Sequence, residues 1–514
     1  MTDFTFSRRS LLAGAAGFAL GASFGPQFAF AQTGHKGVLK YATLGLDTSD
    51  PHRHTGSIAV QQAYVESLTS IASDGSVEPF LSQSFEVSPD GKTYTFKLRP
   101  NVKFHNGDTL SATDVKANIE RVKTKVKGGW LVTAMKLVET VETPDATTLV
   151  VKLDAPYAPF LNLLSELWIL SPKSEGWDET IKTPIGTGPF TFGTWQPKVK
   201  LAAPAFAGYW REGQPKVEAL EFDLSDGSDK SLALRAGDLH IINIELATAD
   251  TLVKAGAADI HGLKDTGWYS IAFNNRKPRK PFDDIRVRQA LALAVDKTSV
   301  MKFVGGDKGV VTNQIVAPGN FYFDQAWHDA DPFRKADLAQ AKKLLDEAGV
   351  KPAEHTIEFV SWQTAYAQIV VQMVRKLGFK VNHVALDDLG TQKRLGQYDW
   401  DMNAMDSGPR ADIFLRLVRL MSDGPNPTLW GGIQDAGLDA LINAGVREPD
   451  GAKRKAKYLE VQKHVQEKGY FYVLGHAPSL IAVRKGVVGY EPGFTWACHW
   501  ASGGVARTSI GAAG

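Results

Sequence analysis

The chain has 514 residues, which is too long for one ordinary hydrophobic core and predicts two or three domains. With 43% hydrophobic and 22% charged residues, it has the composition of a folded soluble protein and not of a disordered one. The 58 basic and 56 acidic residues leave a net charge of +2, which is too small for the positive field that nucleic-acid-binding proteins need. Nucleic acid is therefore not expected as a partner.

Residues 1–31 have the pattern of a cleaved export signal. Arg8 and Arg9 precede an apolar stretch over residues 11–24, and Ala-Phe-Ala at 29–31 satisfies the small-x-small rule of signal peptidase. The arginine pair is typical of a twin-arginine signal, with an ordinary Sec signal as the alternative. The apolar stretch is shorter than the ~20 residues that span a bilayer, so we expect a soluble periplasmic protein.

Cys498 is the only cysteine, so no intramolecular disulfide can form even in an oxidising compartment. The sequence around it offers no activating partner, and we expect it to pack in the interior. The hydrophobic core must therefore supply the stability of the folded chain.

The first half of the chain predicts short strands joined by turns. Residues 38–44, 94–98 and 102–104 have strand patterns, and Asn106-Gly107 predicts a turn because both residues tolerate a positive φ. Ser111 with Asp114 three positions later has the pattern of a capping box, which predicts a helix from there to about residue 125.

The second half predicts alternating strands and helices. Apolar positions in 338–348 lie on one helical face, and Gly349 follows as a helix end. A strand pattern at 355–361, a helix pattern at 366–377 and a strand pattern at 379–386 together predict a right-handed βαβ unit. A further helix is expected at 451–468, with a basic, solvated outer face.

Three segments carry a resemblance to a known family. Residues 94–115 read YTFKLRPNVKFHNGDTLSATDV, residues 184–190 read PIGTGPF with Tyr209-Trp210 further on, and FNNR at 273–276 leads into FDDIRVRQAL at 282–291. In this order and spacing they resemble the peptide/nickel/opine group of extracellular solute-binding proteins, family 5. The resemblance continues through 341–349 and 398–400 and so covers nearly all of the mature chain.

The resemblance implies an α/β, two-lobed periplasmic-binding-protein fold of type II, cluster C-like, with an extra inserted domain. The expected division gives lobe I residues 32–65, 185–268 and 480–514, the inserted domain residues 66–184, and lobe II residues 269–479. Gly186, Gly188 and Pro189 are expected to shape the return from the inserted domain. Arg286 and Arg288 are expected to make structural ion pairs.

The resemblance also implies a function, namely the solute-binding component of an ABC importer, with a membrane permease as partner. A di- or oligopeptide is the expected solute. Nickel, haem, an opine or an oligosaccharide are alternatives within the same class, and an envelope enzyme or chaperone on the same scaffold is an alternative of another class. We expect a monomer without a cofactor.

Candidate ligand contacts lie in the loop 406–412, which reads DSGPRAD and follows a strand-like segment. Open α/β sheets place ligands at the carboxyl ends of their strands. Asp406 could hold a ligand ammonium and Arg410 could bind a carboxylate through two hydrogen bonds. Ordinary surface charge is the alternative for both residues.

Aromatic residues supply the remaining candidates. Trp268 and Tyr269 precede the segment where the chain would cross between the lobes, so their rings could stack on a ligand or pack at the hinge. Trp430 is a further candidate, with core packing as its alternative; the same holds for Trp496 and Trp500.

The sequence offers no convincing catalytic or metal-binding motif. GASFG at 21–25 fits a nucleophile elbow but lies in the export signal, and Gly186-Thr-Gly188 lacks the third glycine of a dinucleotide site. His52, His54 and His105 do not have zinc or calcium spacing, and alternate residues of an extended segment point to opposite sides. We therefore expect a protein that is not an enzyme and has no metal site.

Overall fold

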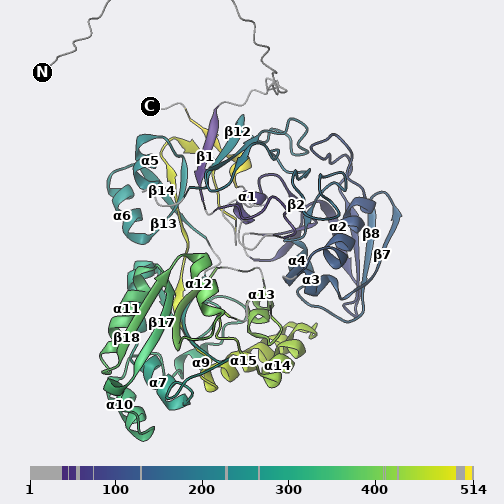
Figure 1. The fold of residues 1–514 in the computed structure, drawn as a ribbon. Helices are drawn as coiled ribbons and strands as arrows, with labels where there is room; N and C mark the ends of the chain where they lie inside the picture. The colour runs from purple at the N-terminus through teal and green to yellow at the C-terminus, as the bar shows by residue number, and fades with distance from the viewer. Residues whose placement is uncertain are drawn as a thin grey trace, which may run out of the picture.

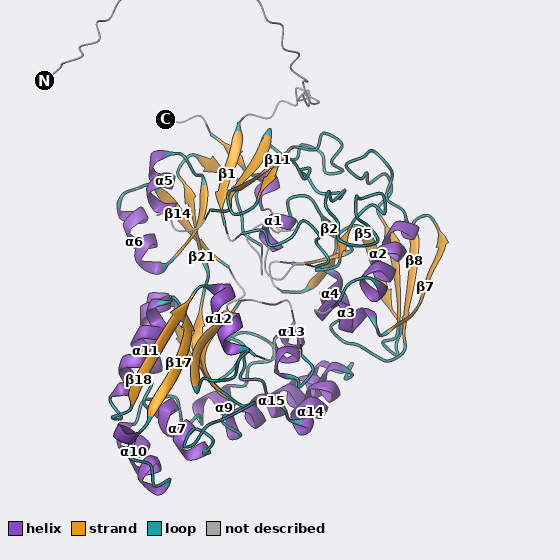
Figure 2. Ribbon diagram, viewed as in Figure 1, coloured by secondary structure: helices purple, strands orange, loops and turns teal. Residues whose placement is uncertain are grey.

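The computed structural model describes residues 37–511, except 44, 54–57, 73–74, 128–129, 226–229, 264–266, 409, 411, 425–427 and 494–503. The export signal, His54, Trp496, Cys498 and Trp500 lie outside the described residues. Figures 1 and 2 show three bodies, each with its own sheet. In this view the body that contains β1 (Val38–Ala42) lies above the body that contains β17 (Thr356–Trp362), and the body that contains β8 (Thr148–Leu153) lies to the right. No helix of the described residues is long and apolar enough to cross a membrane.

The first body, which we call the first lobe, contains a seven-stranded sheet. Its strands in spatial order are β10 (Trp195–Gln196), β11 (Lys200–Pro204), β12 (Ala219–Asp223), β1 (Val38–Ala42), β13 (Ile241–Ile244), β21 (Leu480–Arg484) and β14 (Ala258–Gly262). Strand β1 is parallel to both β12 and β13, whereas β21 is antiparallel to β13 and β14. The carboxyl ends of β1, β13 and β14 and the start of β21 therefore lie at one edge of the sheet.

The second body, the second lobe, contains a six-stranded sheet. Its strands in spatial order are β16 (Val310–Val311), β20 (Phe471–Ala477), β15 (Gly267–Phe273), β19 (Met402–Ser407), β17 (Thr356–Trp362) and β18 (Lys380–Leu386). Strand β17 is parallel to β18 and β19, and β15 is antiparallel to β19. The carboxyl ends of β17 and β19 therefore lie at the same edge as the start of β15.

Helices cover both faces of the second sheet. One face packs on α7 (Ile285–Leu293), α8 (Lys297–Gly305), α10 (Leu338–Glu347) and α11 (Ala365–Arg375). The other face packs on α13 (Ile413–Leu417), α14 (Ala436–Val446) and α15 (Gly451–Glu467). The expected helices and the βαβ unit β17–α11–β18 are confirmed within a few residues of their predicted ends.

The third body contains a four-stranded antiparallel sheet. Its strands in spatial order are β5 (Ser82–Val87), β6 (Thr93–Leu98), β8 (Thr148–Leu153) and β7 (Val138–Asp145). Helix α2 (Ala112–Thr124) begins at Ser111 with both hydrogen bonds of a capping box, as predicted. The predicted strand at 102–104 is wrong: the Asn106-Gly107 turn follows it at once, and only a single bridge between Lys103 and Thr109 forms.

The fold class expected from the sequence is confirmed: an α/β protein with two lobes and an additional body. The residue boundaries given above for the three parts stay a prediction. The chain crosses between the lobes after β14 and again after β20, where only residues 478–479 separate β20 from β21. These two crossings connect the edges at which the parallel strands of both sheets end.

The return of the chain from the third body depends on two glycines. The backbone N–H of Gly188 donates to the carbonyl of Tyr64, and the N–H of Phe190 donates to that of Ala63. A Cβ on Gly186 would lie 1.9 Å from the carbonyl oxygen of Tyr64, and one on Gly188 would lie 2.7 Å from its carbonyl carbon. Only glycine permits this close approach of the outgoing and returning segments.

A buried carboxylate joins the third body to the first lobe. Glu66 accepts hydrogen bonds from the hydroxyls of Thr187 and Tyr209, each at 2.8 Å, and from the indole N–H of Trp210 at 3.0 Å. The guanidinium groups of Arg99 and Arg211 lie 4.9 and 4.7 Å from a ring centroid of Trp210. Burial raises the pKa of Glu66 to about 7 because these hydrogen bonds only partly replace its hydration.

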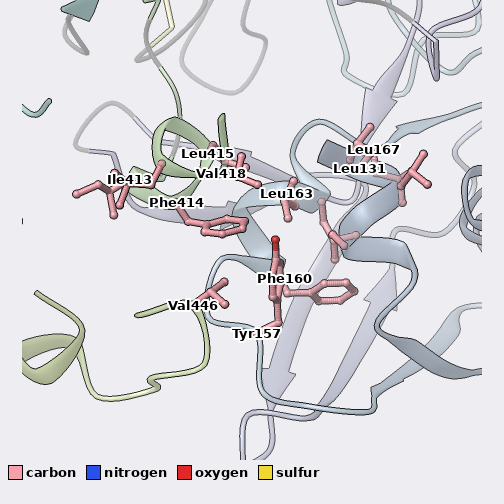
Figure 3. Packing of buried hydrophobic residues seen from close by; sticks show 14 of the residues in the cluster. Leu131, Tyr157, Phe160, Leu163, Leu167, Ile413, Phe414, Leu415, Val418 and Val446 are labelled. Carbon is pink, nitrogen blue, oxygen red and sulfur yellow. The ribbon is translucent and has the colours of Figure 1, made fainter. Parts of the chain in front are cut away.

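The third body also packs against the second lobe, as Figure 3 shows. The rings of Tyr157 and Phe414 meet edge to face, with centroids 5.6 Å apart, and the N–H of Ala158 donates to the carbonyl of Val446 at 3.0 Å. Around them one continuous apolar cluster contains residues of both bodies, among them Leu131, Phe160, Leu163, Leu167, Ile413, Leu415 and Val418. The contact is therefore a shared core and not a polar surface contact.

A second buried network ties residues 50–52 to helix α2. Arg121 donates to both carboxylate oxygens of Asp50, at 3.2 and 2.6 Å, and to Nδ1 of His52 at 2.8 Å. Burial opposes ionisation of Asp50, but the hydrogen bonds and charge of Arg121 outweigh it and hold the pKa of Asp50 below its usual value. Burial and the charge of Arg121 lower the pKa of His52 to about 4, so the ring is neutral and donates from Nε2 to the carbonyl of Trp168.

We expect Asp50→Ala to lower the free energy of unfolding by about 3 to 5 kcal/mol, because it leaves the buried Arg121 charge without its partner. Lys116→Ala, which removes only the exposed pair with Glu120, should cost less than about 1 kcal/mol. Because the pKa of folded Asp50 lies below that of the unfolded chain, its contribution is present above about pH 4 and is lost below it. Urea unfolding at pH 7 measures the two losses, and repeating it at about pH 3 and below follows the disappearance of the Asp50 contribution; equal losses in the two variants at pH 7 would contradict the assignment.

Candidate functional site

A cavity of about 510 Å³ lies where the strand ends of the two sheets face each other. The first lobe contributes the segments after β1 and β13 and the start of β21, and the second lobe contributes the segments after β17 and β19 and the start of β15. Polar and aromatic residues in its wall include Tyr41, Thr43, Asn243, Glu245, Tyr269, Phe303, Thr364, Tyr366 and Asp406. Clefts of this size between domains are typical small-ligand sites.

Two of the candidates from the sequence, Tyr269 and Asp406, lie side by side in the wall of the second lobe. They are directly paired residues on the antiparallel strands β15 and β19. Cross-strand partners point to the same face of a sheet, so both side chains reach the cavity together. The pairing register therefore explains why residues 137 positions apart in the sequence form one site.

Asp406 is a half-buried carboxylate without a counter-ion. Burial raises its pKa to about 6, and only its own backbone N–H lowers it. Within the part of the chain that the structure describes, no side chain donates a hydrogen bond to this carboxylate and no cation pairs with it. An ionised Asp406 is therefore ready to bind a cation supplied by a ligand.

Tyr366 completes this wall from the first turn of helix α11. Its ring meets that of Tyr269 edge to face at 5.1 Å, and only 3% of the residue is exposed. Its hydroxyl has no hydrogen-bond partner among the described residues. Burial raises the pKa of Tyr366 well above its usual value, and the negative charge of Asp406 adds to the shift, so this hydroxyl stays protonated and lies near Asp406.

The first lobe forms the opposite wall with a small polar chain and a carboxylate. The hydroxyl of Tyr41 donates to Asn243 at 3.1 Å, and the amide of Asn243 donates to the hydroxyl of Thr43 at 3.3 Å. Glu245 precedes helix α6 (Leu246–Lys254) at its N-cap position, but its side chain does not cap the helix. Its carboxylate is exposed and lines the cavity.

Trp268 and Trp430 lie away from the cavity. Trp268 is adjacent to Tyr269 on β15, and adjacent side chains of a strand point to opposite faces. Its ring packs edge to face on Trp430 with centroids 5.4 Å apart, and Phe471 lies against both rings. Both tryptophans are fully buried in the core, so in this structure neither ring reaches the cavity.

Arg410 lies on the loop after β19, two residues beyond the cavity-lining Gly408. It is half-buried and close to Arg419, whose pKa is lowered first by burial and then by the charge of Arg410. Arg410 does not line the cavity in this structure. Its predicted contact with a ligand carboxylate stays a prediction.

The histidines considered as metal ligands serve other partners. Both ring nitrogens of His52 are occupied by Arg121 and Trp168, as described above. The ring of His105 donates to the carbonyl of Gly188 at 3.0 Å, and burial lowers its pKa to about 4. Among the described residues no three histidine, cysteine, aspartate or glutamate side chains lie close enough together to hold a metal ion.

Sequence reasoning missed Glu245 and Tyr366, and only Tyr366 followed a strand that had been predicted. Each follows the carboxyl end of a parallel strand, β13 and β17 respectively, which is the rule that identified Asp406. Applying the rule to the predicted strand at 355–361 would have found Tyr366, whereas no strand was predicted at 241–244, where β13 precedes Glu245. That these strand ends meet in one cavity, however, depends on the relative placement of two sheets.

Comparison with known proteins gives consistent results. A family model described as "Bacterial extracellular solute-binding proteins, family 5 Middle" matches residues 76–417. The chain is 28% identical over 393 residues to the glutathione-binding protein GsiB of Salmonella typhimurium, which covers 74% of this chain and 72% of the relative.

Solved structures are similar over almost the whole chain. The oligopeptide-binding protein AppA from Bacillus subtilis, in complex with a nonapeptide, gives a TM-score of 0.80 at 19% identity and covers 93% of this chain and 99% of its own. The periplasmic binding protein AgaA of A. tumefaciens, in complex with agropinic acid, gives 0.78 at 24% identity with the same coverage. At these identities the likeness shows the fold, which is the two-lobed fold expected from the sequence.

We expect Asp406→Asn to stabilise the ligand-free protein by about 1 to 3 kcal/mol at pH 7.5. The pKa of Asp406 is about 6 in the folded protein against 3.8 for an unperturbed aspartate, so its ionised form is disfavoured by folding above pH 6. Below about pH 4 the carboxyl is protonated in both states and the gain should vanish. Thermal or urea unfolding at both pH values measures this.

The control is Asp250→Asn on the exposed face of helix α6, which should change stability by less than about 0.5 kcal/mol at either pH. A wild-type protein that is more stable than Asp406→Asn at pH 7.5 would contradict the account of a desolvated, unpaired carboxylate.

Proposed function

Because the chain belongs to family 5 of the bacterial extracellular solute-binding proteins, we propose that the cavity between its lobes captures a short peptide for an ABC importer. The observation that carries the proposal is Asp406, an unpaired, half-buried carboxylate in the wall of an otherwise largely apolar cavity. The free α-ammonium group of a peptide is a matching partner. A charge-assisted hydrogen bond in such a partly dry site is stronger than one in water.

The names of two similar proteins support a peptide as solute. The Salmonella relative is named for binding glutathione, which is a tripeptide, and AppA was solved with a nonapeptide. A peptide with a free amino end carries an ammonium group at neutral pH, which is the group proposed to bind Asp406. AgaA, solved with agropinic acid, keeps an opine as the second candidate, and an opine would also place charged groups in the cavity.

The two walls of the cavity give a physical reason for closure. An amino group bound at Asp406 is held by the second lobe, while the Tyr41–Asn243–Thr43 chain offers hydrogen-bonding groups of the first lobe to the rest of the peptide. A solute that contacts both lobes stabilises the conformation in which they are close together. Bending at the two crossings, after β14 and after β20, would let the lobes separate for release to the permease.

The same proposal includes the route and the state of the protein. Residues 1–31, with Arg8-Arg9, direct export by the twin-arginine route and are then removed, which leaves a soluble monomer in the periplasm. There the protein binds its solute without changing it, hands it to the permease and catalyses no reaction.

We expect tri-alanine to bind wild-type protein and Asp406→Asn to weaken its binding roughly 10- to 100-fold, because a buried charge-assisted hydrogen bond is lost. N-acetyl-tri-alanine, which has no ammonium group, should bind wild type poorly and be insensitive to the substitution. About one tenth of Asp406 is ionised at pH 5 when its pKa is about 6, so wild-type affinity should fall about tenfold between pH 7.5 and pH 5.

Isothermal titration calorimetry gives these affinities, and native mass spectrometry of protein purified from its host identifies any retained solute. Equal affinity for the free and acetylated peptides would rule out the role of Asp406. A retained solute without an amino group would rule out the peptide.

A separate prediction concerns Arg410. We expect Arg410→Ala to weaken binding of tri-alanine by about 1 to 3 kcal/mol, since the peptide carboxylate would lose its partner. Binding of tri-alanine amide, which lacks that carboxylate, should be unaffected, and the exposed Arg447→Ala serves as the matched control. Wild-type affinity for tri-alanine in Arg410→Ala would refute the assignment.

A further inference from the structure

A second carboxylate, that of Glu245, also lines the cavity. It has no role when a solute's single ammonium group binds Asp406. Glu245 enters the cavity from the first lobe, at the end of β13, and Asp406 enters from the second lobe, at the end of β19. The two are therefore not neighbours on one surface. They belong to opposite walls and approach one another only through the cavity.

Tyr269 lines the same cavity as the two acids and is within reach of the charge of both. The pKa of Tyr269 is raised first by burial and then by the negative charges of Asp406 and Glu245. One phenol therefore lies within electrostatic range of both carboxylates. A small cation bound against this ring would be attracted by both acids at once.

The surrounding side chains suit a cation and not an anion. Among the described residues that line the cavity there is no lysine, arginine or histidine. Four aromatic rings do line it: Tyr41, Tyr269, Phe303 and Tyr366. Aromatic rings attract cations through their faces, and they keep water away from the ion pair.

An independent observation points to a ligand at this position. The hydroxyl of Tyr366 belongs to a residue that is only 3% exposed, lines the cavity and has no hydrogen-bond partner among the described residues. Buried hydroxyls are normally hydrogen-bonded. The buried hydroxyl of Thr364 in the same wall is likewise without a partner in the described part of the chain. Both groups would be satisfied by a polar solute seated between the acids.

From this arrangement we infer that the site selects solutes whose amino end carries two positive charges, one held by Asp406 and the other by Glu245. The preferred substrates are then peptides whose first residue is lysine, arginine or a similar basic residue. This preference rests on the proposed function. The α-ammonium binds Asp406, and the side-chain cation extends across the rings of Tyr269 and Tyr366 to Glu245. Because each acid belongs to a different lobe, such a solute draws the lobes together by charge as well as by contact.

The test compares three peptides that differ only in the first residue: Lys-Ala-Ala, norleucine-Ala-Ala and Glu-Ala-Ala. Norleucine has the same carbon chain as lysine without the amine, so the ratio of the two affinities isolates the second charge. We expect Lys-Ala-Ala to bind about fivefold tighter than the norleucine peptide, as one exposed ion pair allows, and Glu-Ala-Ala to bind more weakly than either. In Glu245→Gln the ratio between the lysine and norleucine peptides should fall to about one.

The control is Asp250→Asn, which removes an exposed negative charge from helix α6, the helix that Glu245 precedes, without touching the cavity. It should keep the wild-type ratio, which excludes a general effect of net charge. Equal binding of the lysine and norleucine peptides by wild type, or an unchanged ratio in Glu245→Gln, would overturn the inference.

Failure of the peptide proposal itself is distinguishable. If wild type binds none of the three peptides, 1,5-diaminopentane and 1-aminopentane are compared in the same way. Tighter binding of the diamine, lost in Glu245→Gln, would support the two-charge site and reject the peptide. Absence of binding by both amines as well would reject both the site and the peptide.

Discussion

The site exists because parallel strands of two separate sheets end against each other. The direction of the strands determines where the cavity lies: the carboxyl ends of β1 and β13 in the first lobe face those of β17 and β19 in the second lobe. The chain crosses between the lobes twice at these edges. Residues that follow a strand end are free of sheet hydrogen bonding and can present side chains to the gap. Glu245 directly follows β13 and Tyr366 lies four residues after β17, whereas Asp406, expected in a loop, is the penultimate residue of β19 and reaches the gap as a strand residue.

The same geometry explains why the cavity contains an unfavourable group. Asp406 is paired with Tyr269 across the strands and not with a cation, so folding desolvates its charge without compensation. Two other buried acids differ from it: Asp50 is paired with Arg121, which holds its pKa below the usual value, and Glu66 accepts hydrogen bonds from three neutral donors that replace part of its hydration. Of these three acids, Asp50 and Glu66 bind side chains that join segments of the protein, whereas Asp406 faces the cavity.

Local patterns in the sequence predicted local structure well. The capping box of Ser111 and Asp114 and the βαβ unit from β17 to β18 follow from residues close together in the chain, and the strand-end rule identified Asp406 without any knowledge of the partner lobe. Whether Trp268 or its neighbour faces the cavity could not be predicted, because that depends on the register between β15 and β19. Trp430, an equally plausible ligand contact by residue type, is buried against Trp268 by tertiary packing alone.

The apolar cluster that joins the third body to the second lobe has a consequence for the resting protein. The edge-to-face contact of Tyr157 with Phe414 lies outside the cavity, and it would have to break if the second lobe moved away from the third body. Separating them would expose buried apolar surface to water, and the free-energy cost of this exposure grows with the exposed area. This apolar contact therefore stabilises the arrangement of the bodies seen in this structure, and Phe414→Ala would weaken that arrangement without changing the lining of the cavity.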